Sequence, residues 1–483
     1  MLLLLNDYRA PIYSLISYSV SNYKSIGLAE EKDDYALTIS FEPSAEKISK
    51  KNEALRLLDN LFTPSENPLE PTEKRIKNNE KADSNSQKLL KGVFIFGDNG
   101  AGKSNIIESL QFLRDFTMGR PSRHFDRFDN QEDAKAHLHK LYEDSCAEHK
   151  VSFYLDAIRY DYTISYDKGL RIKHESLYYS PKGRTTMLFE RNEDSDSIKL
   201  GKSYEHALQN CKIALKPNSP LLGVAARFTD IVPIKNALNF FRKGLVSISL
   251  SRFPRMVDEE IGKYCEDTKR KERVIHCLRR MGIDIADIYS EMIYQTYSRR
   301  IDYDSQDEAI SSRTEERRRV MIRYVLPSDS NEKTKAFTIP LKDESSGIQK
   351  LIAILFPLIE AVDENKIILL DEIENSIHDN AMRELIRYCF EESKEAQILA
   401  VTHATCLLDA MPSQKDRIDE NAPSIPLLRR DQVYFAWKNQ NNRTTKVKAL
   451  CEIKDYYLRA SDTKIRDKYL LGVLLEKQML TDK

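Results

Sequence analysis

A glycine-rich run carries the residues with the most specific chemistry in the chain. Residues 97–104 read GDNGAGKS and match GxxxxGK[ST] at every fixed position. In such a run glycines let backbone N–H groups surround a polyphosphate, the lysine adds positive charge at the β- and γ-phosphates, and the serine hydroxyl ligates Mg²⁺. The run therefore predicts a nucleoside triphosphate site with Ser104 as a metal ligand. The candidate nucleotide-contacting residues are Gly97, Asn99, Gly100, Ala101, Gly102, Lys103, Ser104 and Asn105.

Two downstream segments supply the other groups that phosphate hydrolysis needs. In KIILLDEIENS, the apolar residues Ile367 to Leu370 end in Asp371 and Glu372. The first acid would hold Mg²⁺ and its neighbour would polarise the attacking water. In QILAVTH, an apolar run ends in Thr402 and His403, and we expect His403 to contact the γ-phosphate. Either segment alone is common, and the prediction depends on their combination with the glycine run.

These side chains require a strand before the glycine run and a helix after it. Residues 93–96 form a short apolar run that predicts a buried strand, and residues 106–116 carry apolar side chains at a helical period. The runs IILLDE and ILAVTH are typical of buried parallel strands, each followed by a helix. The sequence therefore predicts an α/β core that brings the three segments together.

The remaining segments differ in residue pattern and in predicted secondary structure. Residues 12–41 alternate as strands do, and residues 151–189 predict a β-meander of four or five strands. Residues 44–87 are polar and dotted with proline, which indicates an insertion, with one short helix at EALRLLDNLF (53–62). Residues 254–281 predict charged helices, and residues 284–323 a strand pair around a charged loop.

Composition excludes several classes of protein. Lys plus Arg and Asp plus Glu number 75 each, so no overall charge attracts the chain to nucleic acid or membranes. The seven cysteines are scattered without a CxxC pair, which favours reduced thiols over disulfides or zinc. No segment is apolar enough to span a bilayer. The expectation is a soluble cytoplasmic protein without membrane contact.

The motifs together resemble those of the ABC-type ATPases, and more narrowly the branch similar to structural-maintenance-of-chromosomes (SMC) and OLD proteins. SVSNYKSI (19–26) resembles the N-terminal strand motif of that branch, and GDNGAGKSN its phosphate loop. DESSGIQKL (343–351) resembles the ABC signature, and LLDEIENSIH with VTH resembles the Walker B strand and switch histidine. The resemblance implies ATP and Mg²⁺ as ligands, with Glu372 and His403 catalytic and Ser104 and Asp371 on the metal.

The resemblance also implies an architecture. An ABC-type P-loop core with a parallel or mixed sheet flanked by helices would be built from residues 1–118 and 337–483. Residues 119–250 would form an inserted β-rich lobe, and residues 251–336 a short helical arm with a strand pair. The lobe is similar to that of small ATPases in bacterial anti-phage operons of the abortive-infection, Septu-like and PARIS-like systems. Gln131 is the candidate for the glutamine loop.

The signature-like segment implies a partner subunit. Ser346, Gly347 and Gln349 match S-G-G-Q, with Ile348 in place of the second glycine, and an apolar helical face follows. In the family this helix N-terminus contacts ATP held by the other subunit. The resemblance therefore implies a homodimer or higher homo-oligomer with composite ATP sites.

Three readings of the function follow. The first is an ATP-gated dimer that acts as sensor or scaffold of an anti-phage system and controls a separate nuclease or toxin encoded nearby. The second is an OLD-like nuclease, but residues after His403 lack the spaced carboxylates of a Toprim nuclease. The third is a DNA-binding ATPase of the repair or recombination type, contacting nucleic acid through the basic runs 269–280 and 313–323.

Overall fold

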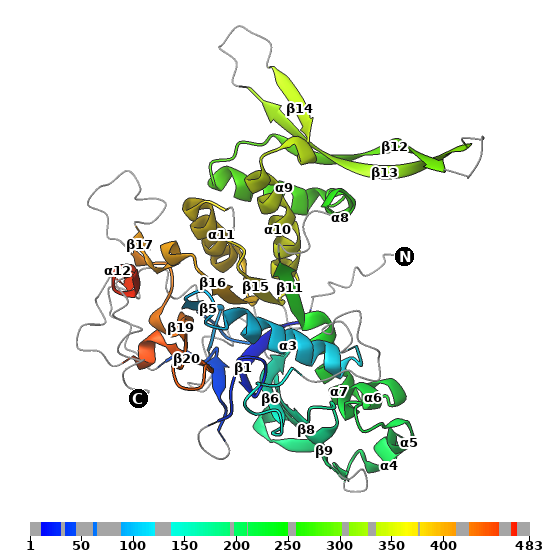
Figure 1. Cartoon of the computed structure of the whole chain (residues 1–483), viewed down its shortest axis with the longest axis vertical. Coiled ribbons are helices and arrows are strands. Elements are labelled where there is room, and N and C mark those ends of the chain that lie inside the picture. Colours follow the sequence, from blue (N-terminus) through cyan, green and yellow to red (C-terminus); the bar gives the residue numbers. More distant parts are fainter. Residues whose placement is uncertain are drawn as a thin grey trace, which may run out of the picture. The chain divides into compact units, whose positions relative to one another are not determined.

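The computed structural model in Figure 1 describes most of the chain. The described residues are 11–29, 34–44, 61–64, 88–120, 137–193, 198–209, 211–249, 257–301, 309–326, 335–374, 377–411, 425–453 and 465–470. They divide into two compact units. Unit 1 comprises Met1–Ser247, Ala361–Glu372 and Cys389–Lys483, and unit 2 comprises Ile248–Glu360 and Ile373–Tyr388. The candidate Gln131 lies outside the described residues.

A six-stranded sheet in unit 1 contains the predicted buried strands. In spatial order its strands are β11 (Leu245–Ser249), β15 (Ile367–Asp371), β16 (Gln397–Thr402), β5 (Gly92–Gly97), β19 (Val433–Lys438) and β20 (Thr445–Ala449). β15, β16, β5 and β19 run parallel, whereas β20 is antiparallel to β19. Because the carboxyl ends of parallel strands meet at one edge, the residues after β5, β15 and β16 lie close together. The predicted α/β fold class is confirmed.

A seven-stranded antiparallel sheet forms the second layer of unit 1. In spatial order its strands are β10 (Lys199–Leu200), β9 (Thr186–Asn192), β8 (Ile172–Ser180), β7 (Ile158–Tyr166), β6 (Ala147–Leu155), β1 (Tyr13–Ser21) and β2 (Leu37–Ser40). The predicted meander is confirmed as β6 to β9. The N-terminal strand β1 pairs with β6, so the N-terminal segment shares one sheet with the meander.

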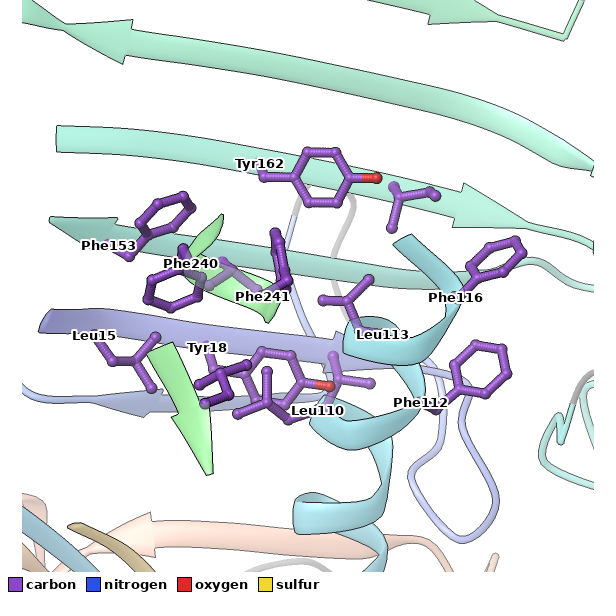
Figure 2. Close-up of a cluster of buried hydrophobic side chains, with 14 of the residues drawn as sticks. Leu15, Tyr18, Leu110, Phe112, Leu113, Phe116, Phe153, Tyr162, Phe240 and Phe241 are labelled. Carbon is purple, nitrogen blue, oxygen red and sulfur yellow. The ribbon is translucent and has the colours of Figure 1, made fainter. Parts of the chain in front are cut away.

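Helix α3 (Lys103–Thr117) starts at the glycine run and contacts β5, β15 and β16, and its apolar side chains pack on the seven-stranded sheet. Figure 2 shows its apolar side chains facing those of β1, β6 and β7. Phe153 of β6 stacks on Phe240 with ring centroids 3.8 Å apart. The cluster includes Leu15, Tyr18, Leu110, Phe112, Leu113, Phe116, Phe153, Tyr162, Phe240 and Phe241, all buried. This core fixes the helix that begins at the predicted phosphate site.

A chain of polar groups crosses the same core. Tyr166 Oη lies 2.8 Å from His149 Nε2, and His149 Nδ1 lies 2.9 Å from Tyr18 Oη. Tyr18 donates to Ser109 Oγ at 2.7 Å, and Ser109 donates to the carbonyl oxygen of Ile106 at 2.8 Å. Since the Tyr18 proton is used on Ser109, His149 must donate from Nδ1 and accept from Tyr166 at Nε2. We call Tyr166, His149, Tyr18 and Ser109 the buried chain.

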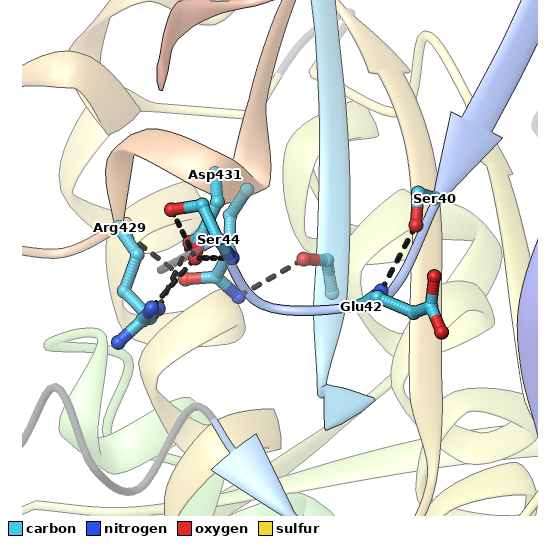
Figure 3. Close-up of polar contacts among 7 residues, drawn as sticks. Ser40, Glu42, Ser44, Arg429 and Asp431 are labelled. Atoms are coloured by element: carbon cyan, nitrogen blue, oxygen red, sulfur yellow. Dashed lines mark hydrogen bonds and ion pairs between the residues drawn. The ribbon is translucent and has the colours of Figure 1, made fainter. Parts of the chain in front are cut away.

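The start of β19 is tied to two other segments of unit 1, as Figure 3 shows. Asp431 accepts hydrogen bonds from the backbone N–H of Ser44 at 3.0 Å and from Arg429 Nη2 at 2.6 Å. Gln432 donates to the carbonyl oxygen of Gly92, at the start of β5, at 2.9 Å. These contacts hold β19 against the strand that leads into the glycine run.

Short elements complete unit 1. They are β3 (Leu61–Phe62), β4 (Leu89–Leu90), β17 (Ala410–Met411), β18 (Ile425–Pro426), α4 (Glu205–Gln209), α5 (Cys211–Ala214), α6 (Leu221–Phe228), α7 (Val232–Asn239) and α12 (Ile465–Leu470). The predicted helix at residues 53–62 is wrong at its end, where β3 pairs with β4. Phe62 and Leu89 are buried there with Ile16, so tertiary burial overrides local helix propensity. Residues 53–60 lie outside the described residues.

Unit 2 contains two charged helices and a long β-hairpin. Helices α8 (Val257–Tyr264) and α9 (Thr268–Arg280) lie within residues 254–281, where the sequence predicts charged helices. Strands β12 (Asp287–Ile301) and β13 (Ala309–Val325) confirm the strand pair, and β14 (Ala336–Pro340) extends it to three strands. Helices α10 (Ser346–Asp363) and α11 (Asp379–Glu392) begin in unit 2 and end in unit 1.

Candidate functional site

The predicted phosphate loop connects β5 to α3. Gly100 and Gly102 have φ angles of 78° and 92°, a region that favours glycine. Helix α3 begins at Lys103, and its N-cap Gly102 provides no side-chain cap. The first-turn N–H groups therefore depend on other acceptors, and they carry the positive end of the helix dipole. Such a helix start favours the binding of an anion.

Lys103 is buried within this loop, with 3% of its surface exposed. Its Nζ donates to the carbonyl oxygens of Gly97 at 2.9 Å and Asp98 at 3.1 Å. It also lies 2.8 Å from His403 Nε2. Because an ammonium only donates, this contact requires His403 Nε2 to accept, which places the ring proton on Nδ1.

Ser104 and Asp371 form an oxygen pair beside the loop. Ser104 Oγ donates to Asp371 Oδ1 at 3.0 Å, although the two residues are 267 positions apart. A hydroxyl and a carboxylate are the hard oxygen donors that Mg²⁺ prefers, and Mg²⁺ sites at phosphates use one or two carboxylates with the substrate supplying further ligands. Among the described residues no group of three or more His, Cys, Asp or Glu side chains forms a metal site. The Ser104 hydroxyl and the Asp371 carboxylate fit a Mg²⁺ ion whose further ligands come from a bound phosphate.

Glu372 and His403 lie at the ends of adjacent strands. Glu372 directly follows β15 with a φ of 46°, and its N–H donates to the carbonyl oxygen of Val401 at 3.0 Å. For a residue other than glycine this conformation costs about 1–2 kcal/mol, which the neighbouring structure offsets. Glu372 Oε1 lies 3.6 Å from His403 Nε2, and both side chains are partly exposed. The Glu372 carboxylate therefore lies beside the histidine ring.

The structure brings five predicted site residues together: Lys103, Ser104, Asp371, Glu372 and His403. We call them the site cluster. They come from three segments of unit 1 that are far apart in sequence. Their chemical roles stay a prediction.

The signature-like segment lies in unit 2, at the start of α10. Ser345 Oγ accepts from the N–H of Ile348 at 3.4 Å, so Ser345 is the capping serine and Ser346 is an exposed first-turn residue. Gln349 donates its side-chain amide to the carbonyl oxygens of Lys342 at 3.0 Å and Glu344 at 2.7 Å. Gln349 therefore holds the turn before the helix. Nucleotide contact by Ser346, Gly347 and Gln349 stays a prediction.

The basic run of α9 is engaged within unit 2. Ion pairs join Arg270 to Glu360 at 3.3 Å, Lys271 to Asp287 at 2.9 Å and Arg280 to Glu384 at 3.3 Å. These pairs favour a structural role for the helix over phosphate binding.

The basic run of β13 is engaged in the same way. Arg317 pairs with Glu315 at 3.2 Å, and Arg318 pairs with Glu266 at 2.5 Å. To contact a nucleic-acid phosphate, Arg317 and Arg318 would first have to leave these carboxylates. The predicted nucleic-acid contact through residues 269–280 and 313–323 is not supported by these pairs.

Sequence reasoning did not assign roles to several residues around the site cluster. Asn22, within the SNYKS segment, donates to the carbonyl oxygens of Tyr142 and Ser145, each at 2.9 Å. Its Oδ1 accepts from the N–H of His139 at 3.1 Å. Thr445 hydrogen-bonds to the phosphate loop at Ala101, and Ser25 contacts Thr445 and Asn105. No spacing in the sequence links Thr445 to the loop, because the pairing arises only in the folded chain.

Comparison with solved structures finds SMC head domains. One is the SmcHead bound to the C-winged helix domain of ScpA, with 14% identity, TM-score 0.34, and coverage of 75% of this chain and 93% of that chain. Another is the SMC head domain from Thermotoga maritima, with 13% identity, TM-score 0.31, and coverage of 76% and 95%. A third is the Pyrococcus furiosus Smc head domain with an extended coiled coil bound to the C-terminal domain of ScpA, with 12% identity, TM-score 0.34, and coverage of 97% and 100%.

No helix of the described residues has the length and apolar content needed to cross a membrane.

Comparison with curated protein sequences finds no match. A protein family matches residues 93–209 and 247–409, which include all of the site cluster. Its description is "AAA domain, putative AbiEii toxin, Type IV TA system". Because the match covers more than half of the 483 residues, the chain belongs to this AbiEii-type AAA domain family.

Proposed function

We propose that this protein is an ABC-type ATPase that binds ATP with Mg²⁺ and hydrolyses it in the site cluster. The observation that carries the proposal is a set of three contacts between distant segments. Lys103 lies 2.8 Å and Glu372 3.6 Å from His403 Nε2, and their sequence neighbours Ser104 and Asp371 lie 3.0 Å apart. A lysine for the phosphates, a serine–aspartate pair for Mg²⁺ and a residue that orients the attacking water are the parts that phosphoryl transfer uses. Membership of an AAA domain family supports the same reaction.

The side chains divide the work of the reaction between them. Lys103 would exchange its contacts with the carbonyl oxygens of Gly97 and Asp98 for phosphate oxygens, while the N-terminus of α3 stabilises the same charge. Ser104 and Asp371 would hold Mg²⁺, which neutralises phosphate charge when bound.

Glu372 and His403 would act at the attacking water. Glu372 is the candidate general base, because its carboxylate is partly exposed and lies beside the histidine. Once a phosphate takes the Lys103 ammonium, His403 Nε2 loses that donor and could accept a hydrogen bond from the attacking water. A contact with the γ-phosphate would require the ring proton to sit on Nε2 instead of Nδ1. The hydrogen-bond partner of His403 would thus differ between the empty site and the nucleotide-bound site.

Phosphate release tests this proposal. Replacing Glu372 with Gln keeps the shape of the side chain and removes its basicity, so turnover should fall by about 10²- to 10⁴-fold. Glu364→Gln makes the same chemical change at an ion pair with Lys366, and we expect wild-type turnover from it. Equal turnover from wild type and Glu372→Gln would refute the role of Glu372 as the base. If wild type released no more phosphate than Lys103→Met, the ATPase proposal itself would be refuted.

We extend the proposal to an ATP-dependent homodimer. Its support is that one chain carries both the site cluster and a signature-like helix start at Ser346. The Glu372→Gln variant should accumulate as the ATP-bound dimer, because hydrolysis would no longer separate the subunits. Light scattering with and without Mg-ATP measures this directly. An unchanged mass in both conditions would exclude ATP-driven dimerisation.

The biological role that we propose is control of a separate effector in bacterial anti-phage defence, in the cytoplasm. The family description, which names an AbiEii toxin and a type IV toxin–antitoxin system, supports this class of role. An effector nuclease or toxin would be encoded beside the gene. Cells carrying the locus should resist phage, and Lys103→Met should abolish resistance at equal protein level. Resistance that survives Lys103→Met would refute an ATP-driven role.

A DNA-processing role is the second candidate, and the ion pairs of α9 and β13 argue against it. We expect the purified protein neither to cleave plasmid with Mg-ATP nor to bind duplex DNA in a salt-dependent way. Cleavage that disappears with Lys103→Met would favour this candidate instead.

A further inference from the structure

Two hydroxyl side chains from distant segments lie against the phosphate loop. Ser25 follows β1, and Thr445 begins β20, 420 positions later along the chain. Their oxygens lie 2.7 Å apart, and Thr445 Oγ1 lies 2.9 Å from the carbonyl oxygen of Ala101. Asn105, in the first turn of α3, reaches Ser25 Oγ with Nδ2 at 2.6 Å. These contacts hold the loop on both sides of Gly102, and we call them the loop clamp.

The carbonyl at one end fixes the direction of every hydrogen bond in the loop clamp. A carbonyl oxygen only accepts, so Thr445 donates its hydroxyl proton to Ala101. Ser25 must then donate to Thr445, and it accepts from the Asn105 amide. Lys438 Nζ, 3.1 Å from Thr445 Oγ1, provides a second donor to that oxygen. Thr445 therefore donates once and accepts twice, which fills its hydrogen-bonding capacity.

The close approach of the loop clamp explains why residue 102 is glycine. A Cβ at Gly102 would lie 2.1 Å from Thr445 Oγ1 and 2.5 Å from Ser25 Oγ. Either distance is far inside van der Waals contact, and the φ of 92° would strain any other residue. The hydroxyls could not reach the loop backbone past a side chain. Glycine at this position is thus required by the clamp as well as by the turn.

The orientation of one peptide group links the clamp to function. The Ala101–Gly102 peptide is trans, so its C=O and N–H point in opposite directions. With the carbonyl held by Thr445, the N–H of Gly102 is turned away from Thr445. Backbone N–H groups of such loops are the groups that surround a polyphosphate. We infer that Thr445 is a positioning residue of the phosphate loop, which holds the Ala101–Gly102 peptide in the orientation that nucleotide binding requires.

Main-chain hydrogen bonds hold Thr445 in the fold, so its hydroxyl can be removed without disturbing them. The N–H of Thr445 donates to the carbonyl oxygen of Ser25 at 2.7 Å, and β20 pairs with β19 through its main chain. Neither contact involves the side chain of Thr445. Thr445→Val should therefore fold while losing all three side-chain hydrogen bonds, and Thr445→Ser should keep them.

The test compares these two variants with Thr229→Val. Thr229 is also buried and donates its hydroxyl to a carbonyl oxygen, that of Ala225 at 2.8 Å, but it lies in the lobe. Hydrogen–deuterium exchange of residues 97–106 in nucleotide-free protein reports the clamp itself. Loss of the side-chain hydrogen bonds in Thr445→Val should speed this exchange about tenfold, and the other two variants should stay within about twofold of wild type.

Mg-ATP affinity, measured by calorimetry, provides the second readout, and it rests on the proposed function. We expect Thr445→Val to bind about tenfold more weakly, with Thr445→Ser and Thr229→Val near wild type. The inference would be overturned if Thr445→Val had the exchange rate or the Mg-ATP affinity of wild type. It would also be overturned if Thr445→Ser lost as much affinity as Thr445→Val. If the wild-type protein bound no ATP, the proposed ATPase would fail, whereas the exchange measurement would still decide whether the clamp holds the loop.

Discussion

The site cluster and the buried chain are two polar networks on the same helix, one at the start of α3 and the other at Ser109 near its middle. They differ in how their protons are used. In the buried chain each hydrogen bond has one direction: Tyr166 donates to His149, His149 to Tyr18, and Tyr18 to Ser109. All four side chains are fully buried. In the site cluster His403 Nε2 faces a donor, Lys103, at 2.8 Å and a carboxylate, Glu372, at 3.6 Å.

One nitrogen cannot accept from Lys103 and donate to Glu372 at the same time. The contacts of His403 must therefore change when the charge around it changes, whereas the buried chain has no alternative arrangement. We therefore expect the buried chain to stabilise the fold and the site cluster to respond to a ligand. We expect substitutions in the two networks to have opposite consequences for stability and for nucleotide turnover.

The largest expected effect is a loss of turnover at the site cluster without loss of stability. Asp371→Asn removes the charge that would hold Mg²⁺, so Mg²⁺-dependent turnover should fall by about 100-fold. The free energy of unfolding in urea should stay within about 0.5 kcal/mol of wild type, because the side chain is only partly buried. Asp161→Asn, which alters an ion pair with Arg159 in β7, serves as the control with full turnover.

The reverse effect is expected in the buried chain. His149→Phe keeps a ring of similar size but leaves the Tyr166 hydroxyl without an acceptor and Tyr18 without a donor. The free energy of unfolding should fall by about 3 kcal/mol, while Mg-ATP affinity stays within about threefold. His174→Phe, at a half-buried site in β8, should cost less than about 1 kcal/mol. A large loss of affinity with intact stability in His149→Phe would break the comparison.

The same histidine predicts the response to acid. Burial lowers the pKa of His149 to about 3, below its value of 6.5 when exposed. Between these values the unfolded chain binds more protons than the folded one, so stability should fall as the pH falls from 6.5 toward 3. Urea unfolding at several pH values should show this slope in wild type and a weaker slope in His149→Phe. Parallel curves for the two proteins would exclude the histidine as its source.

The smallest expected effect concerns Lys438, next to the loop clamp. Burial, with a further contribution from Arg443, lowers the pKa of Lys438 to about 8 from 10.5. Between these two pKa values the unfolded chain binds more protons than the folded one, so the free energy of unfolding should rise as the pH rises from about 8 toward 10.5. Lys438→Met should remove the rise. An identical rise in the variant would assign it to another group.

Much of the site cluster could be predicted from sequence because its signals are local. The glycine run, the strand ends at Asp371 and Glu372, and the strand end at His403 each carry a short pattern, and parallel strands necessarily bring their carboxyl ends together. The same holds for the β6 to β9 meander, whose alternation and turns are visible in the sequence.

The remaining features depend on the folded chain. Nothing in the spacing of Ser25 and Thr445 indicates that they meet, because β1 and β20 belong to different sheets. Ser345 and Ser346 are adjacent and chemically identical, so only the structure distinguishes the capping serine. The strand at Leu61–Phe62 likewise forms through burial against Leu89, which outweighs a helical pattern.

Calorimetric titration of Mg-ATP into the purified protein tests the central claim most directly, with Lys103→Met as the paired variant. If the site cluster holds one nucleotide, wild type should give a saturable heat with one ATP per chain, and Lys103→Met should give none at the same concentrations. No heat from wild type, or equal heat from both proteins, would contradict the account.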